Sequence, residues 1–158
     1  MLFANITEEN RQEINALILN TWYSTEMIVR GKIIDMTKLE GIVAYDNEAI
    51  VGLVTYYIEN KYLEVVSIDS FNENQGVGTE LTKRVIEVAK SKGCQKVKLI
   101  TTNDNFKALA FYQKRGFELV CIYKNAVEKA RDIKPEIPII GLGGIPIRDE
   151  IELEYVIK

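Results

Sequence analysis

The sequence contains no histidine among its 158 residues. This absence excludes Ser-His-Asp and Cys-His catalysis, histidine general bases and nearly every His-ligated zinc or iron site. Any acid–base chemistry must therefore come from Glu, Asp, Tyr, Lys, water or the backbone. We accordingly expect a site without a metal ion.

Cysteines are few, and long apolar runs are absent. Cys94 and Cys121 are too few for a disulfide framework and lack CxxC spacing, so we expect both to be small buried side chains. No apolar run approaches the length of a membrane span, and the N-terminus has no basic segment followed by an apolar core. These features predict a cytoplasmic protein with no membrane partner.

The overall composition is that of an ordinary soluble globular protein, with 47% hydrophobic and 27% charged residues. A chain of this length is most simply one domain, spanning residues 1–158. Its formal net charge of −3 argues against nucleic acid as a partner and slightly favours a cationic substrate.

The first half of the chain predicts one helix and then an antiparallel meander. Thr7 is a candidate N-cap for the helix. A short strand or turn is expected near residues 27–29. Residues 41–60 form two apolar runs around a turn, which predicts a hairpin, and residues 61–70 predict a third strand.

The second half alternates between helical and strand patterns. Its expected elements are a helix from Val77 to Gly93, a strand at 96–102, a helix at 105–116, a strand at 117–123, a short helix at 125–134 and a strand at 151–157. The last strand alternates apolar residues with Glu152 and Glu154, so we place it at a sheet edge or beside 117–123. An edge strand there leaves room for a homodimer. The whole pattern predicts an α+β domain with a mixed, mostly antiparallel sheet and helices on both faces.

The segment ENQGVGTEL, residues 73–81, is typical of a loop that holds phosphates. It is not a Walker A loop, because Gly78 is followed by Thr79 and Glu80 instead of Lys and Ser or Thr. The third glycine of a Rossmann loop is also missing, since Leu81 occupies its place. The remaining interpretation is a pyrophosphate site at a helix N-terminus, where backbone N–H groups of residues 75–79 face the ligand.

This loop resembles the acyl-coenzyme-A loop of GNAT-superfamily N-acetyltransferases. A second segment, NFKALAFYQKRGFE, is similar to another signature of that family through Asn105, Ala108, Tyr112, Gly116 and Phe117. The resemblance covers residues 41–123. It implies a coenzyme-binding core at about 62–123, followed by a C-terminal helix, loop and strand at 125–158.

One position departs from the family pattern. The family usually has Arg or Gln where this chain has Glu73, and a carboxylate facing the pyrophosphate would repel it. The backbone amides would then hold the phosphates, helped by Lys83 or Arg84.

The resemblance implies that acetyl-CoA is the cosubstrate and that an amine attacks its thioester directly in a ternary complex. It also implies roles for Tyr112 as proton donor to the leaving thiolate and for Asn105 as a coenzyme ligand. The alternatives are a buried tyrosine packed beside Phe111, and an Asn105 that caps its helix together with Asp104. The implied coenzyme-binding residues are Val66, Ile68, Gln75, Gly76, Val77, Gly78, Thr79 and Asn105.

The general base is expected on the strand at 61–70, where Glu64 and Asp69 are the candidates. In a regular strand their side chains would point to opposite faces, so at most one would be well placed. The glycine-rich loop at 139–146 is interpreted as structural.

Three functions remain open at this point. The favoured one is an N-acetyltransferase whose acceptor is a small-molecule amine or a protein amine of unknown identity. The second is a non-catalytic acyl-CoA-binding or regulatory module. The third, a dinucleotide-binding oxidoreductase domain, conflicts with the missing glycine.

Overall fold

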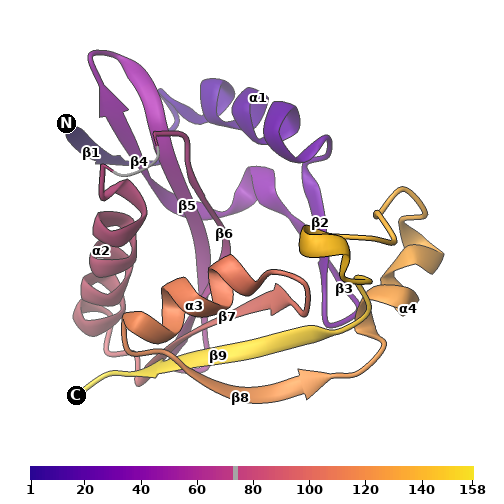
Figure 1. Cartoon of the computed structure of the whole chain (residues 1–158). Helices are drawn as coiled ribbons and strands as arrows, with labels where there is room; N and C mark the ends of the chain where they lie inside the picture. Colours follow the sequence, from indigo (N-terminus) through magenta and orange to yellow (C-terminus); the bar gives the residue numbers. More distant parts are fainter. Residues whose placement is uncertain (73–74) are drawn as a thin grey trace. The chain divides into compact units, whose positions relative to one another are not determined.

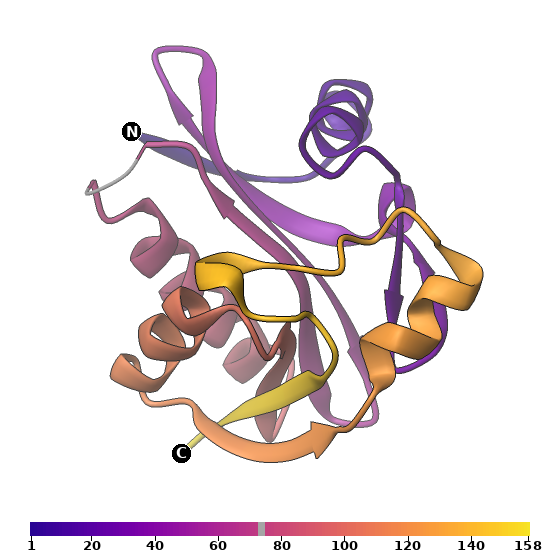
Figure 2. The same cartoon turned by 45° about the vertical axis from the view of Figure 1, so that its right-hand side comes forward.

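The computed structural model describes residues 1–72 and 75–158, and they pack as two compact units. Unit 1 contains Met1–Met27, Asp35–Val97 and Ile157–Lys158, and unit 2 contains Ile28–Ile34 and Lys98–Val156. Figures 1 and 2 show their helices and strands, coloured along the chain. The assignment of 1–158 to one domain with the expected internal boundaries stays a prediction.

The sheet of unit 1 is an antiparallel meander in the order β1-β4-β5-β6. Its strands are β1 (Leu2–Asn5), β4 (Glu40–Asp46), β5 (Ala49–Glu59) and β6 (Tyr62–Ser70). The central residues of β4 and β5 form long buried apolar runs because both faces of the sheet are covered. Helices α1 (Arg11–Trp22) and α2 (Val77–Ser91) lie on opposite faces (Figures 1 and 2). The predicted meander is confirmed.

Helix α1 begins later than expected. The N-cap is Asn10 and not Thr7, because the Thr7 N–H donates to Asn10 Oδ1 at 2.7 Å and folds the preceding residues into a turn. Asn10 Nδ2 also donates to Asn5 O at 3.0 Å, which ties the helix start to the end of β1. The completely buried Ile14 and Ile18 then anchor the helix on the sheet.

Helix α2 matches the expected span. Its buried residues recur at helical spacing and face the sheet: Val77, Leu81, Thr82, Val85 and Ala89. The chain leaves the helix through Gly93, whose φ of +74° lies in the left-handed region that favours glycine.

Unit 2 is built on three strands in the order β7-β9-β8, with β8 and β9 antiparallel. Its elements are β7 (Lys96–Thr102), α3 (Phe106–Lys114), β8 (Glu118–Tyr123), α4 (Ala126–Ile133) and β9 (Glu150–Val156). A separate two-stranded ribbon joins β2 (Glu26–Val29) to β3 (Lys32–Asp35). Single 3₁₀ turns occupy Met36–Lys38 and Leu142–Gly144. The α+β class is confirmed.

The last strand pairs with β8 as expected but is not at an edge, because β9 lies between β7 and β8. This interior place buries Glu150 and Glu152. Glu150 Oε1 accepts a hydrogen bond from Arg30 N at 2.9 Å, and Glu152 Oε1 accepts one from the Tyr123 hydroxyl at 2.9 Å. The Arg30 guanidinium lies 3.7 Å from the Glu152 carboxylate. Buried carboxylates need such partners. Because these partners are distant in sequence from β9, the alternation of apolar and acidic residues in the strand does not predict them.

The glycine-rich loop before β9 has the structural role expected for it. Leu142 N donates to the buried Asp104 Oδ2 at 3.1 Å. Arg131 Nη2 donates to Pro138 O at 2.6 Å and to Ile147 O at 2.7 Å. These bonds fasten the loop to the β7–α3 turn and to α4.

Gly52 of β5 provides a first test of the packing. A Cβ at this position would lie 2.5 Å from Val77 Cγ1 and 3.1 Å from Leu81 Cδ1, at the beginning of α2. We expect Gly52→Ala to lower the free energy of unfolding by about 1–3 kcal/mol, because the extra methyl group overpacks this contact. Urea unfolding measures the change. Ala49→Ser, at the exposed start of the same strand, is the control, and equal stability of the two variants would contradict the packing described.

Candidate active site

The glycine loop leads directly into α2. Gly76 is the N-cap, with φ +72°, a conformation that L side chains rarely adopt. The first helical hydrogen bond runs from Glu80 N to Gly76 O at 3.0 Å, so the N–H groups of Val77 and Gly78 precede it. Gly76 has no side chain that could cap these groups. The helix start therefore has the geometry of an anion site.

Two residues of the signature, Glu73 and Asn74, lie outside the described residues. The effect of Glu73 on coenzyme binding therefore stays an open question of the sequence analysis. Gln75 and Gly76 are exposed, and Val77 is buried as the first residue of the helix.

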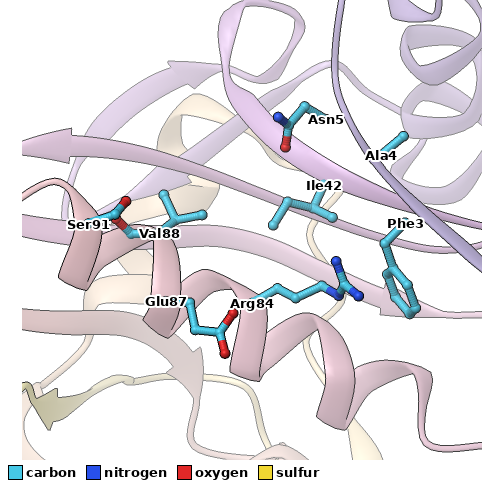
Figure 3. A pocket seen from close by; sticks show the side chains of 8 residues that line it. All are labelled: Phe3, Ala4, Asn5, Ile42, Arg84, Glu87, Val88 and Ser91. Atoms are coloured by element: carbon cyan, nitrogen blue, oxygen red, sulfur yellow. The ribbon is translucent and has the colours of Figure 1, made fainter.

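Arg84 is occupied elsewhere on α2. Its guanidinium pairs with Glu80 at 3.0 Å and lies 4.2 Å from the centre of the Phe3 ring. Figure 3 shows Arg84 extending beside Phe3 of β1. Of the two cations expected to assist the phosphates, Lys83 is the exposed one that is not held in this way. We therefore keep only Lys83 as a candidate.

The cavity in Figure 3 does not coincide with the glycine loop. It has a volume of about 280 Å³ and lies between β1 and the later turns of α2. Its lining residues are Phe3, Ala4, Asn5, Ile42, Arg84, Glu87, Val88 and Ser91. Apart from Arg84, which is set aside above, none of the residues predicted for the site is among them, so we assign the cavity no part in the site.

Strand β6 contains a β-bulge at the position expected to bind the thioester. Thr55 of β5 is opposite Ser67 and Tyr56 is opposite Val65, which leaves Val66 as an extra residue. A bulge interrupts the regular ladder and re-aims the backbone groups around it. Val66, one of the residues implied to bind the coenzyme, therefore stands at the irregular point of the strand, and Ile68 follows two residues later.

The same bulge overturns one expectation about the candidate bases. Glu64 is opposite Tyr57 and Asp69 is opposite Leu53. Tyr57 and Leu53 are four residues apart on β5 and share a face, so Glu64 and Asp69 share a face too. The prediction of opposite faces is wrong because the extra residue, Val66, reverses the alternation between them.

Polar groups gather on this shared face. The Thr55 and Ser67 hydroxyl oxygens are 2.5 Å apart and buried. Trp22, the last residue of α1, donates its indole N–H to Asp69 Oδ2 at 3.1 Å. The α1 side of the sheet therefore carries the hydroxyl pair and both candidate bases. No signal in the sequence pointed to the bond between Trp22 and Asp69, which are 47 residues apart.

The surroundings of Asp69 alter its pKa. Burial raises the pKa of Asp69 above its ordinary value of 3.8, and the Trp22 hydrogen bond acts in the opposite direction. A carboxylate with a raised pKa is a stronger base once it is ionised. Glu64 is only 1% exposed and has an interaction partner of its own.

The remaining predicted residues belong to unit 2. Tyr112 is buried, and its ring packs edge-on against Phe111 at 5.1 Å and Phe117 at 5.4 Å between centroids. Asn105 Oδ1 accepts the Ala108 N–H at 3.2 Å and caps α3. The packing and capping alternatives are thus present in the structure. The catalytic role of Tyr112 and the coenzyme contact of Asn105 stay predictions.

Asp104 does not share the capping of α3, contrary to expectation. Its carboxylate accepts bonds from Leu142 N and from the Thr102 hydroxyl instead. The cysteine expectation is half correct. Cys94 is buried, whereas Cys121 is exposed because β8 is the outer strand of unit 2.

Two kinds of feature are absent from the described residues. Among residues 1–72 and 75–158, no three or more Cys, Asp or Glu side chains group so as to hold a metal ion. Within the same ranges, none of the helices has the length and apolar character needed to cross a membrane.

Comparison with known proteins identifies the family. Residues 6–117 match the sequence model of the Acetyltransferase (GNAT) family. The chain belongs to the GNAT acetyltransferase family. The bulged strand, the glycine loop and the following helix all lie within the matched region, so the expected family is confirmed.

One relative and two solved structures illustrate what this chain is similar to. The Bacillus subtilis protein described as "Uncharacterized protein YdhI" is 48% identical over 137 residues, which is 86% of each chain. The structure of an IAA acetyltransferase from Bacillus cereus has a TM-score of 0.75 at 22% identity and covers 99% of both chains. A GNAT acetyltransferase from Elizabethkingia anophelis, solved with acetyl-CoA bound, has a TM-score of 0.71 at 23% identity and covers 99% of this chain and 97% of its own. These structures confirm the GNAT fold.

The Trp22–Asp69 bond predicts a measurable titration. We expect the Asp69 carboxyl to titrate above 3.8 and to titrate still higher in Trp22→Phe, because losing a donor disfavours the charged form. NMR of the labelled carboxyl carbon measures both midpoints. Tyr23→Phe, at the exposed neighbouring residue, is the control and should leave the midpoint unchanged. A midpoint that stays in place in Trp22→Phe would show that the bond does not act on Asp69.

Proposed function

We propose that this GNAT protein transfers an acetyl group from acetyl-CoA to a primary amine, which attacks the thioester directly in a ternary complex. The observation that carries the proposal is the bulge at Val66 in the same compact unit as the Gly76–α2 junction. The bulge offers backbone groups outside the regular ladder that can bind the thioester carbonyl. The junction offers a helix N-terminus that can bind the pyrophosphate. Acetyl-CoA contains both a thioester carbonyl and a pyrophosphate.

The coenzyme site uses backbone more than side chains. In our proposal the N–H groups of Val77 and Gly78 bind the pyrophosphate, together with Gln75, Gly76 and Thr79 of the same loop. Glycine at position 78 lets the backbone approach the phosphates closely. On β6, Val66 and Ile68 provide the backbone contacts to the thioester end, and Asn105 is a further proposed contact.

In this proposal the carboxylates of β6 accept a proton and the Tyr112 hydroxyl donates one. An alkylamine has a pKa of about 10.4 and is mostly protonated at neutral pH, so it must lose a proton before it attacks. Asp69 accepts this proton in the proposal, directly or through water, and Glu64 is the second candidate. The amine nitrogen bonds to the carbonyl carbon, the C–S bond breaks, and the Tyr112 hydroxyl supplies the proton for the departing thiolate.

The acceptor is proposed to be a cationic amine. Two carboxylates on one face of β6 and a net charge of −3 favour an ammonium group over an anionic or neutral acceptor. A small molecule and a protein amine share this chemistry. A cytoplasmic location is part of the same proposal.

Coenzyme binding is tested by Gly78→Trp. The indole would fill the space above the first turn of α2, so we expect loss of acetyl-CoA binding by calorimetric titration while the fold is kept. Lys90→Trp, at an exposed site later on α2, is the matched control and should bind normally. NAD and ATP are control ligands for the parent protein. Binding of NAD in place of acetyl-CoA would overturn the proposal in favour of a dinucleotide-binding domain.

Catalysis is tested by Asp69→Asn. The amide cannot accept the proton, so we expect kcat/KM to fall about 10²–10⁴-fold in a thiol-release assay with an amine panel. In the parent protein, activity should fall as pH drops through the Asp69 pKa, which lies above 3.8, because the protonated carboxyl is inactive.

Two comparisons make the result specific. Glu64→Gln should cost less than Asp69→Asn, and Tyr112→Phe should lower kcat. Acetyl-CoA binding without turnover of any amine, with no effect of Tyr112→Phe, would instead support the non-catalytic acyl-CoA-binding module.

A further inference from the structure

Unit 2 contains a cavity of about 520 Å³ that none of the residues proposed for acetyl transfer lines. Its walls come from three segments, which are the turn between β2 and β3, the end of β8 and one face of α4. Figures 1 and 2 both show the β2–β3 turn beside α4. A cavity of this size can hold a small organic molecule. We call it the α4 pocket, and its charged and apolar lining includes Arg30, Lys124, Lys129, Ala126, Ala130 and Ile133.

All charges that line the α4 pocket are positive. They belong to Arg30, Lys124 and Lys129, and no acidic residue is part of the lining. Both lysines are exposed, and in the part of the chain that the structure describes neither forms an ion pair. Arg148 Nε and Nη2 donate to the Asp149 carboxylate at 2.9 Å each and lower its pKa, and the charge of Lys124 adds only a weaker effect. Asp149 is thus already paired with another cation.

Two buried carboxylates of β9 contact lining residues without lining the pocket themselves. Glu152 Oε1 accepts the Tyr123 hydroxyl at 2.9 Å and lies 3.7 Å from the Arg30 guanidinium. Glu150 Oε1 accepts the Arg30 N–H at 2.9 Å. These contacts hold Arg30 and Tyr123 in place and balance the Arg30 charge. The positive charge that remains for a ligand therefore comes from the two lysines.

Helix α4 gives the pocket an apolar wall. Ala126, Ala130 and Ile133 follow each other at spacings of four and three residues, so they share one face of the helix. The acidic residues of the helix, Glu128 and Asp132, lie outside this face by the same periodicity. The two alanines leave space for a ligand, and the Ile133 side chain is 53% exposed. An apolar wall beside two ammonium groups suits an organic anion better than a bare inorganic one.

We propose that the α4 pocket binds a small organic carboxylate. Its anionic group lies between Lys124 and Lys129, and its apolar body packs against Ala130 and Ile133. A carboxylate suits two ammonium groups, because the planar guanidinium of Arg30, which would favour a phosphate, is already held by Glu152. The cationic amine proposed as acetyl acceptor would be repelled here. The pocket is therefore an additional binding site, and its test is independent of acetyl transfer.

The first experiment locates the site with hexanoate. In an amide NMR titration of the labelled parent protein, we expect saturable shifts at Gly31, Lys124 and Lys129, with a dissociation constant of about 1 mM or tighter. Hexylamine, which has the same apolar body and the opposite charge, should cause no shift at these amides. The proposal is overturned if hexanoate gives no saturable shift there up to about 10 mM, or if hexylamine binds equally well.

The second experiment tests the two lysines. The double variant with Lys124→Gln and Lys129→Gln should bind hexanoate at least about tenfold more weakly, because both charge-assisted contacts are lost. Lys107→Gln is the matched control, since Lys107 is an exposed lysine on α3 of the same unit, outside the pocket, and it should bind like the parent. Equal affinity of the double variant and the parent would contradict the proposed contacts.

The third experiment tests the apolar wall. Acetate lacks most of the body of hexanoate, so we expect it to bind about tenfold more weakly. Inorganic phosphate, which has charge and no apolar part, should also bind more weakly than hexanoate. Affinity for acetate or phosphate that equals the affinity for hexanoate would show that charge alone governs the site, and would overturn the assignment of an organic ligand.

Discussion

The arrangement of the site depends on one extra residue in β6. Because Val66 has no partner on β5, the strand switches its alternation between Glu64 and Asp69. The switch places both carboxylates on the α1 face and interrupts the regular ladder at Val66. A regular strand of the same composition would separate the two carboxylates and keep its amides in the ladder. The chemistry proposed for this protein therefore begins with a backbone irregularity.

The neighbouring strand, β5, positions the second part of the candidate site in unit 1, which is the start of α2. Gly52 of β5 leaves room for Val77, the first residue of α2, to pack directly on the sheet. This contact holds the start of the helix, and with it the N–H groups of the first turn, against the sheet. The same two strands thus position the bulge and the anion site, while α1 supplies Trp22 to hold Asp69. Most of these groups are ordinary residue types. Their proposed roles depend on where the backbone places them.

Much of the fold was predictable because it follows from local periodicity. The meander, α2, α3 and the pairing of the last strand with 117–123 were all correct. The errors came from partners distant in sequence or from small register changes. YLEVVSIDS gives no signal of a bulge, and Glu150 and Glu152 are buried because Arg30 and Tyr123 meet them in space. The N-cap of α1 is Asn10 and not the expected Thr7 for a local reason. The Asn10 side chain accepts a hydrogen bond from the Thr7 N–H, and capping preferences alone do not predict this bond.

The central claim is that acetyl-CoA binds along the β6 bulge and the start of α2. The most direct test is an amide NMR titration of the isotopically labelled protein with acetyl-CoA. The account predicts the largest shifts at the backbone amides of Val66, Ser67 and Ile68 and of Gly76, Val77 and Gly78, with small shifts along β1 and the later turns of α2. Shifts confined to the cavity beside Phe3 and Arg84, or none at saturating acetyl-CoA, would contradict it.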